Sequence, residues 1–98
     1  MRGIQRSTQK NIMKILDLLK SLDGPIHLRG IVRATKLNPF IISYILDNYL
    51  DGFVDTKTII QYGFKAKLIQ LKEGKENITL TDVMRYLEIR KQIKNKIK

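Results

Sequence analysis

The apolar residues in the first quarter of the chain recur at spacings of three and four, which is the period of an amphipathic helix. This pattern predicts a helix over residues 9–22, with Ser7 or Thr8 as its cap. Its expected core positions are Ile12, Ile15, Leu16, Leu19 and Leu22. The run Asp23-Gly24-Pro25 predicts a turn after this helix, because all three residue types are frequent in turns.

Two short helices with a tight break between them are predicted next. The first covers residues 28–35 and is expected to bury Leu28, Ile31, Val32 and Ala34. The second starts at Pro39, since proline suits the first helical turn and Asn38 is a preferred N-cap. It ends before Gly52, a residue type common after helices. Such a pair forms a helix-turn-helix, whose second helix is shaped to enter the DNA major groove.

The helix from Pro39 contains more apolar residues than one buried face requires, so two core registers are compatible with it. One register buries Ile42, Ile45, Tyr49 and Phe53. The other buries Ile41, Ile45, Asn48 and Gly52. We prefer the first register, because the second would bury the amide of Asn48. It leaves Phe40, Ser43, Tyr44 and Asp47 facing outward.

After Gly52 the pattern changes to that of strands. Residues 54–62 are rich in β-branched side chains, Gly63 supplies a turn and residues 65–71 form a second expected strand, so a hairpin is expected with its tip near residues 62–65. Ile26 is expected to add one short strand before the second helix. The predicted fold is therefore α+β and mostly α-helical.

A long helix is expected over residues 79–97, opened by Thr79 and Asp82 in an arrangement like a capping box. Leu80, Val83, Met84 and Leu87 suit packing onto the rest of the domain. A second stripe has nothing left in this chain to cover it, and it consists of Tyr86, Ile89, Ile93 and Ile97. We expect this stripe to form a homodimer interface. Binding to a membrane surface is the alternative, which the absence of Trp or Phe in this helix disfavours.

Charge points to the kind of partner. The 98 residues contain 19 Lys and Arg against 9 Asp and Glu, for a net charge of +10, which favours a polyanion such as nucleic acid. The alternative is the lysine-rich surface of a heat-adapted protein. Residues 37–56 are the exception, because they contain three aspartates and no Lys or Arg.

Other functions find little support in the composition. The chain has no Cys and only one His, His27, which is expected to begin a helix near solvent rather than to bind a metal. No paired carboxylates, nucleophile set or phosphate-binding glycine loop suggests an enzyme, a cofactor or a small-molecule ligand. No apolar run is long enough for a membrane span, so a location in the cytoplasm, of a host cell if the protein is viral, is expected.

The order of these elements resembles that of the small winged-helix DNA-binding proteins of archaea, their plasmids and viruses. It is also similar to bacterial repressors of the multiple-antibiotic-resistance and arsenic-sensing types. The similarity covers residues 9–97 and includes the segment Tyr-Leu-Asp-Gly-Phe-Val at residues 49–54. It divides the chain into a basic arm (1–8), a winged helix-turn-helix domain (9–75) and a C-terminal dimerisation helix (76–98).

The resemblance implies a homodimeric, sequence-specific transcriptional regulator that binds double-stranded DNA. Its third helix would lie in the major groove, while the second helix and the hairpin, or wing, would contact phosphates. The expected DNA-binding residues are Arg29, Arg33, Lys36, Asn38, Phe40, Ser43, Tyr44, Asp47, Lys57, Tyr62, Lys65 and Lys67. Alternatives are a winged-helix module that binds other proteins and an architectural protein that binds DNA without sequence preference.

Overall fold

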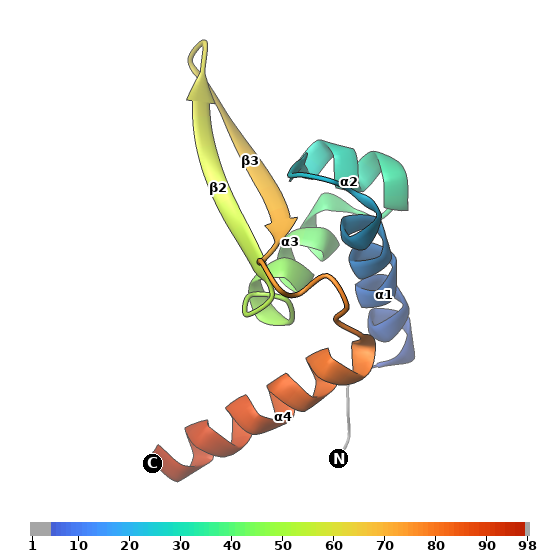
Figure 1. Cartoon of the computed structure of the whole chain (residues 1–98), viewed down its shortest axis with the longest axis vertical. Helices are drawn as coiled ribbons and strands as arrows, with labels where there is room; N and C mark the ends of the chain where they lie inside the picture. Colours follow the sequence, from blue (N-terminus) through green and yellow to red (C-terminus); the bar gives the residue numbers. More distant parts are fainter. Residues whose placement is uncertain (1–4, 98) are drawn as a thin grey trace.

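The computed structural model describes residues 5–97, with the exception of the side chains of residues 61 and 94–97. Within this range the chain forms an α+β fold of four helices and one three-stranded antiparallel sheet (Figure 1). The elements in chain order are α1 (Arg6–Ser21), β1 (Ile26–His27), α2 (Leu28–Thr35), α3 (Pro39–Asn48), β2 (Val54–Gln61), β3 (Phe64–Leu71) and α4 (Leu80–Ile97). The predicted elements and their order are confirmed.

Helix α1 begins earlier than its sequence pattern indicated. The residue before it is Gln5, and the backbone N–H of Gln9 donates to the Gln5 carbonyl at 2.9 Å, which closes the first helical turn. Ser7 and Thr8 are therefore helical residues, and the expectation that one of them caps the helix is wrong. The basic arm predicted at residues 1–8 ends at least three residues earlier, and residues 1–4 lie outside the described part.

The sheet has the strand order β1-β3-β2, so the two long strands form a hairpin and the short β1 pairs with β3. Ile26 lies opposite Ile69 in the β1–β3 pair, which confirms the short strand expected at Ile26. The β2–β3 hairpin runs in register from Val54 opposite Leu71 to the two-residue turn at its tip. Figure 1 shows that its distal half extends beyond the helices, with the turn at the far end of the molecule.

The core lies where α1, α2, α3 and the base of the hairpin meet. Its fully buried large side chains are Ile12, Ile15, Leu16, Ile31, Ile42, Ile45, Leu50, Ile69 and Val83. The preferred register of α3 is confirmed, because Ile42 and Ile45 are buried and Asn48 is exposed.

One core position in α2 differs from the prediction. Ala34 is exposed, whereas the neighbouring Thr35 is buried. The Thr35 hydroxyl donates to the backbone carbonyl of Ile31 at 2.7 Å. Because this hydrogen bond satisfies the hydroxyl, the threonine is tolerated in the core, where the hydrophobic pattern alone placed alanine.

Helix α4 is anchored to the domain through its first turns. The backbone N–H of Asp82 donates to the Thr79 hydroxyl at 3.3 Å, and the Thr79 N–H donates to the Asp82 carboxylate at 2.9 Å, which confirms the capping box. These hydrogen bonds lower the pKa of Asp82 below its ordinary value. Val83 is fully buried in the core, so this end of the helix is held by both packing and capping.

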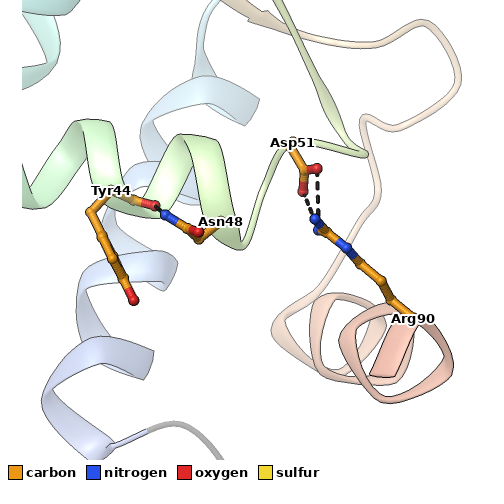
Figure 2. A network of polar contacts seen from close by, with 4 residues as sticks. All are labelled: Tyr44, Asn48, Asp51 and Arg90. Carbon is orange, nitrogen blue, oxygen red and sulfur yellow. Dashed lines mark hydrogen bonds and ion pairs between the residues drawn. The ribbon is translucent and has the colours of Figure 1, made fainter. Parts of the chain in front are cut away.

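Tyr86 also packs within the chain, so the expectation that nothing covers it is wrong. Its ring meets that of Phe53 edge-on, with centroids 5.0 Å apart. A Cβ at Gly52 would lie 2.7 Å from the Tyr86 ring, so a larger residue there would require the ring to shift. One turn further, the Arg90 guanidinium donates to both carboxylate oxygens of Asp51, at 2.9 and 3.1 Å (Figure 2). Beyond Arg90 the helix leads away from the domain (Figure 1).

Candidate nucleic-acid interface

The turn between α2 and α3 is held by local hydrogen bonds. Lys36 follows α2 in the left-handed conformation, with φ of 64°. The Leu37 N–H donates to the Thr35 hydroxyl at 3.3 Å, and the Asn38 side chain accepts from the Phe40 N–H at 2.7 Å. Pro39 then occupies the first position of α3. This arrangement confirms the predicted cap and fixes the direction in which α3 leaves the turn.

The outer face of α3 presents aromatic and acidic side chains. Phe40 is 83% exposed and Tyr44 is 58% exposed, while Asp47 is also exposed and Ser43 is half-buried. Ile41, which is 41% exposed, lines a shallow hollow between α3 and the start of α1. The face is open to a partner, but it contains no cation.

Tyr44 of α3 contacts two residues at the C-terminal end of that helix. The Tyr44 and Tyr49 rings meet edge-on with centroids 5.8 Å apart, and the Asn48 side-chain amide donates to the Tyr44 carbonyl at 2.9 Å (Figure 2). Burial raises the pKa of Tyr49, and the proximity of Tyr44 raises it further. Both effects favour the neutral hydroxyl of Tyr49 over its charged form.

A cationic groove lies between α2 and β3. It brings together four of the expected DNA-binding residues, namely Arg29, Arg33, Lys65 and Lys67. The remaining lining residues are Pro25, Ile26, His27, Leu28, Gly30, Phe64 and Ala66, so no carboxylate lines it within the described chain. None of the four cations forms an ion pair with a described residue. The groove is therefore a region of uncompensated positive charge.

Close packing of α2 against β1 places the two walls of this groove side by side. A Cβ at Gly30 would lie 2.7 Å from the Ile26 side chain, so a larger residue would require that side chain to shift. Ile26 in turn pairs with Ile69 on β3. The glycine thus lets α2 lie next to the strand that carries the two lysines.

The strand register decides which hairpin lysines face the groove. Lys65 pairs with Ile60, Lys67 with Thr58 and Ile69 with Thr56, so these positions of β3 share one face. Ile69 is buried against the helices, and the same face therefore looks toward α2 further along the hairpin. Lys57 pairs with Leu68 and belongs to the opposite face.

The other expected residues are distributed around the groove. Lys36, at the end of α2, is exposed but does not line the groove. Tyr62 is at the hairpin tip and 89% exposed. Ile60 and Phe64, which flank it, were not included among the expected contacts, although they are 70% and 77% exposed. Their exposure could have been predicted, because side chains alternate between the two faces of a strand and Gly63 marks a turn close to both residues.

The expected dimer stripe is partly open. Ile89 and Ile93, four residues apart on α4, are 51% and 53% exposed. Tyr86 instead packs against Phe53, as described above. Ile97 belongs to α4, but its side chain lies outside the described part.

A metal site and a membrane span are two further features that a chain of this size can contain. No group of three or more His, Cys, Asp or Glu side chains in this part is arranged to hold a metal ion. No helix in it has the length and apolar character needed to cross a membrane. Comparison with protein-family models, with curated proteins and with solved structures found no match to the chain.

Proposed function

We propose that this chain is a winged helix-turn-helix protein that binds double-stranded DNA as a homodimer and regulates transcription. The observation that carries the proposal is the cationic groove, in which Arg29, Arg33, Lys65 and Lys67 converge without a neutralising carboxylate. Lysine and arginine side chains bind DNA by displacing the counterions of its phosphates. A groove that gathers four of them from two separate elements is suited to a phosphate backbone.

The order of elements supports the same class of protein. A helix-turn-helix of α2 and α3 is followed directly by the β2–β3 hairpin, and β1 closes the sheet at its other edge. In this arrangement α3 enters the major groove, while α2 and the hairpin bind phosphates along its edge.

The composition of α3 defines the base contacts that it offers. Phe40 provides an apolar surface for a thymine methyl group, and Asp47 provides an acceptor for the amino group of cytosine. Ser43 and Tyr44 provide hydroxyls that hydrogen-bond to base edges or phosphates. Since α3 lacks the arginine or lysine that usually reads guanine, α3 supplies selectivity and the groove supplies most of the affinity.

Helix α4 supplies the dimer interface in this proposal. Ile89 and Ile93 lie four residues apart in the second half of α4, and both are half exposed. Pairing with the same stripe of a second copy buries them and places two DNA-binding units on one duplex.

Charge reversal in the groove tests DNA binding. The variant Lys65→Glu with Lys67→Glu is compared with Lys10→Glu with Lys14→Glu, which makes the same change of charge at exposed positions of α1. Gel shifts with duplexes of several sequences are expected to show a large loss of affinity for the first variant on every sequence. The second variant is expected to lose far less. Equal losses would remove the groove from the interface.

A second function, binding to another protein through α3, is favoured by one observation. The outer face of α3 combines three exposed apolar side chains, Phe40, Ile41 and Tyr44, with an aspartate and no cation. Such a surface suits a basic, apolar segment of a partner. Passage through a DNA or heparin column without retention at moderate salt would favour this function over DNA binding.

A further inference from the structure

The tip of the β2–β3 hairpin exposes large apolar side chains on all its sides. Ile60 is 70% exposed, Tyr62 is 89% exposed and Phe64 is 77% exposed. Ile60 belongs to the face that carries Lys65, Phe64 pairs with residue 61 on the opposite face, and Tyr62 is in the turn itself. We call these three side chains the apolar tip. No described residue covers them, so they contribute little hydrophobic stabilisation to folding.

The backbone at Tyr62 is a second, independent observation. Tyr62 has φ of 53° and Gly63 has φ of 80°, so both turn residues are left-handed, as in a type I′ hairpin turn. Asn, Asp and Gly adopt this conformation readily, whereas a bulky aromatic residue is strained in it. Tyr62 gains no ring contact within the described chain that would compensate for the strain. The presence of tyrosine at this strained position is therefore better explained by binding to a ligand than by a role in folding.

We infer that the apolar tip is a wedge that enters between stacked base pairs of bound duplex DNA, unstacks them and bends the duplex. This inference rests on the proposed function, since it requires DNA in the cationic groove. Proteins that kink DNA insert apolar side chains between base steps and hold the neighbouring phosphates with cations. Here Lys65 follows Phe64 directly, and Lys67 is two residues further along the same strand.

The position of the cations favours DNA over a lipid surface as the partner of the tip. Amphipathic helices that lie in a membrane surface carry their cations on one polar face, opposite the apolar residues that enter the lipid. The cations here continue from Lys65 along β3 to Lys67, and from there across the groove to Arg29 and Arg33. The four cations therefore form a row from the hairpin to α2. Such a row can follow the phosphates along an elongated duplex, whereas a bilayer is a flat surface.

The test uses the full chain and short duplexes that contain 2-aminopurine, whose fluorescence rises when its base unstacks. A donor and an acceptor dye at the two ends of the duplex report bending. The variants are Tyr62→Asn, which fits the left-handed turn, and Phe64→Thr, which introduces a smaller residue that also favours strands. Met13→Asn is the control, because it removes an exposed apolar side chain from α1.

The wild type and Met13→Asn are expected to raise the 2-aminopurine fluorescence several-fold at one base step and to bring the duplex ends closer. Tyr62→Asn and Phe64→Thr are expected to lose most of both signals while their affinity changes only a few-fold, because unstacking offsets the contacts of the tip. Tyr62→Asn is also expected to melt at a higher temperature than the wild type, which excludes misfolding as the cause.

Four results would overturn the inference, and the last of them would also overturn the proposed function. Tight DNA binding by the wild type without unstacking or bending would reject the wedge and leave the proposed function intact. Tip variants that distort DNA as the wild type does would have the same meaning. Loss of co-sedimentation with phosphatidylserine vesicles in Tyr62→Asn, with DNA distortion unchanged, would assign the tip to lipid. Absence of any DNA binding by the wild type would instead reject the proposed function, and the wedge with it.

Discussion

The two ends of the β2–β3 hairpin contain similar residues in different surroundings. At the base, Val54 and Ile69 are buried in the core, and at the tip, Ile60 and Phe64 are exposed to solvent. Both ends are paired in the same antiparallel register. Burial of the apolar side chains at the base stabilises the hairpin, whereas the exposed side chains at the tip remain available for binding. Helix α4 is divided in the same way, with Val83 buried near its start and Ile93 exposed further along.

The largest effect on stability is expected from the base of the hairpin. Ile69→Ala removes a fully buried side chain and is expected to lower the free energy of unfolding by about 2–5 kcal/mol. Ile60→Ala, the same substitution at the tip, is expected to change it by less than about 0.5 kcal/mol. Urea denaturation of both variants measures the difference. Equal losses of stability in the two variants would show that Ile60 is packed as tightly as Ile69. This result would contradict the difference between the base and the tip.

A smaller effect is expected at the outer part of α4, on association and not on folding. Ile93→Glu is expected to weaken the proposed dimer by about 1.5–3 kcal/mol from lost burial alone. The stability of the protomer is expected to stay unchanged, because Ile93 is 53% exposed. Sedimentation equilibrium of wild type and variant measures the association. A wild type that is monomeric at all concentrations would contradict the dimer.

At the tip itself a substitution is expected to stabilise the protein. Tyr62→Asn is expected to raise the free energy of unfolding by about 1 kcal/mol, because asparagine tolerates the left-handed conformation that strains tyrosine. Thermal melting measures the change. A loss of stability would mean that the Tyr62 ring contacts the fold, in disagreement with its exposure.

The smallest effect is expected at the cap of α4 and depends on pH. The folded state lowers the pKa of Asp82 through the hydrogen bonds from Thr79, so the charged carboxylate stabilises the fold above the ordinary pKa of 3.8. This contribution is lost as the pH falls through the lowered pKa. Asp82→Asn is therefore expected to be less stable than the wild type at neutral pH and to approach it in acid. Urea denaturation at several pH values checks this, and a difference that persists in strong acid would contradict it.

Much of the fold was predictable because local signals agreed with the tertiary structure. Asn38 before Pro39, and Thr79 three residues before Asp82, mark the starts of α3 and α4 correctly. The register of α3 followed from the cost of burying the Asn48 amide. Each of these predictions depends on a few neighbouring residues, and such interactions can be recognised in the sequence alone.

Features that depend on distant residues were not predictable. The contact of Tyr86 with Phe53 needs the space above Gly52, and no local pattern reveals that space. The burial of Thr35 was missed for a different reason, because it depends on a local hydrogen bond to Ile31 that a hydrophobicity pattern does not contain. All four cations of the groove were predicted as DNA-binding residues. Lys57 was predicted as well, and the sequence did not show that it lies outside the groove. The pairing of β3 with β1 and β2 brings Lys65 and Lys67 to the groove and turns Lys57 away.

The salt dependence of DNA binding tests the central claim most directly. If the four cations of the groove each neutralise one phosphate, the logarithm of the association constant is expected to fall with the logarithm of salt concentration with a slope of about −3.6 per protomer. Filter binding or fluorescence anisotropy of the wild type across a salt series gives this slope. A steep slope that becomes shallower by about 2 in Lys65→Glu with Lys67→Glu agrees with the account. A slope near zero, or no binding at low salt, would contradict it.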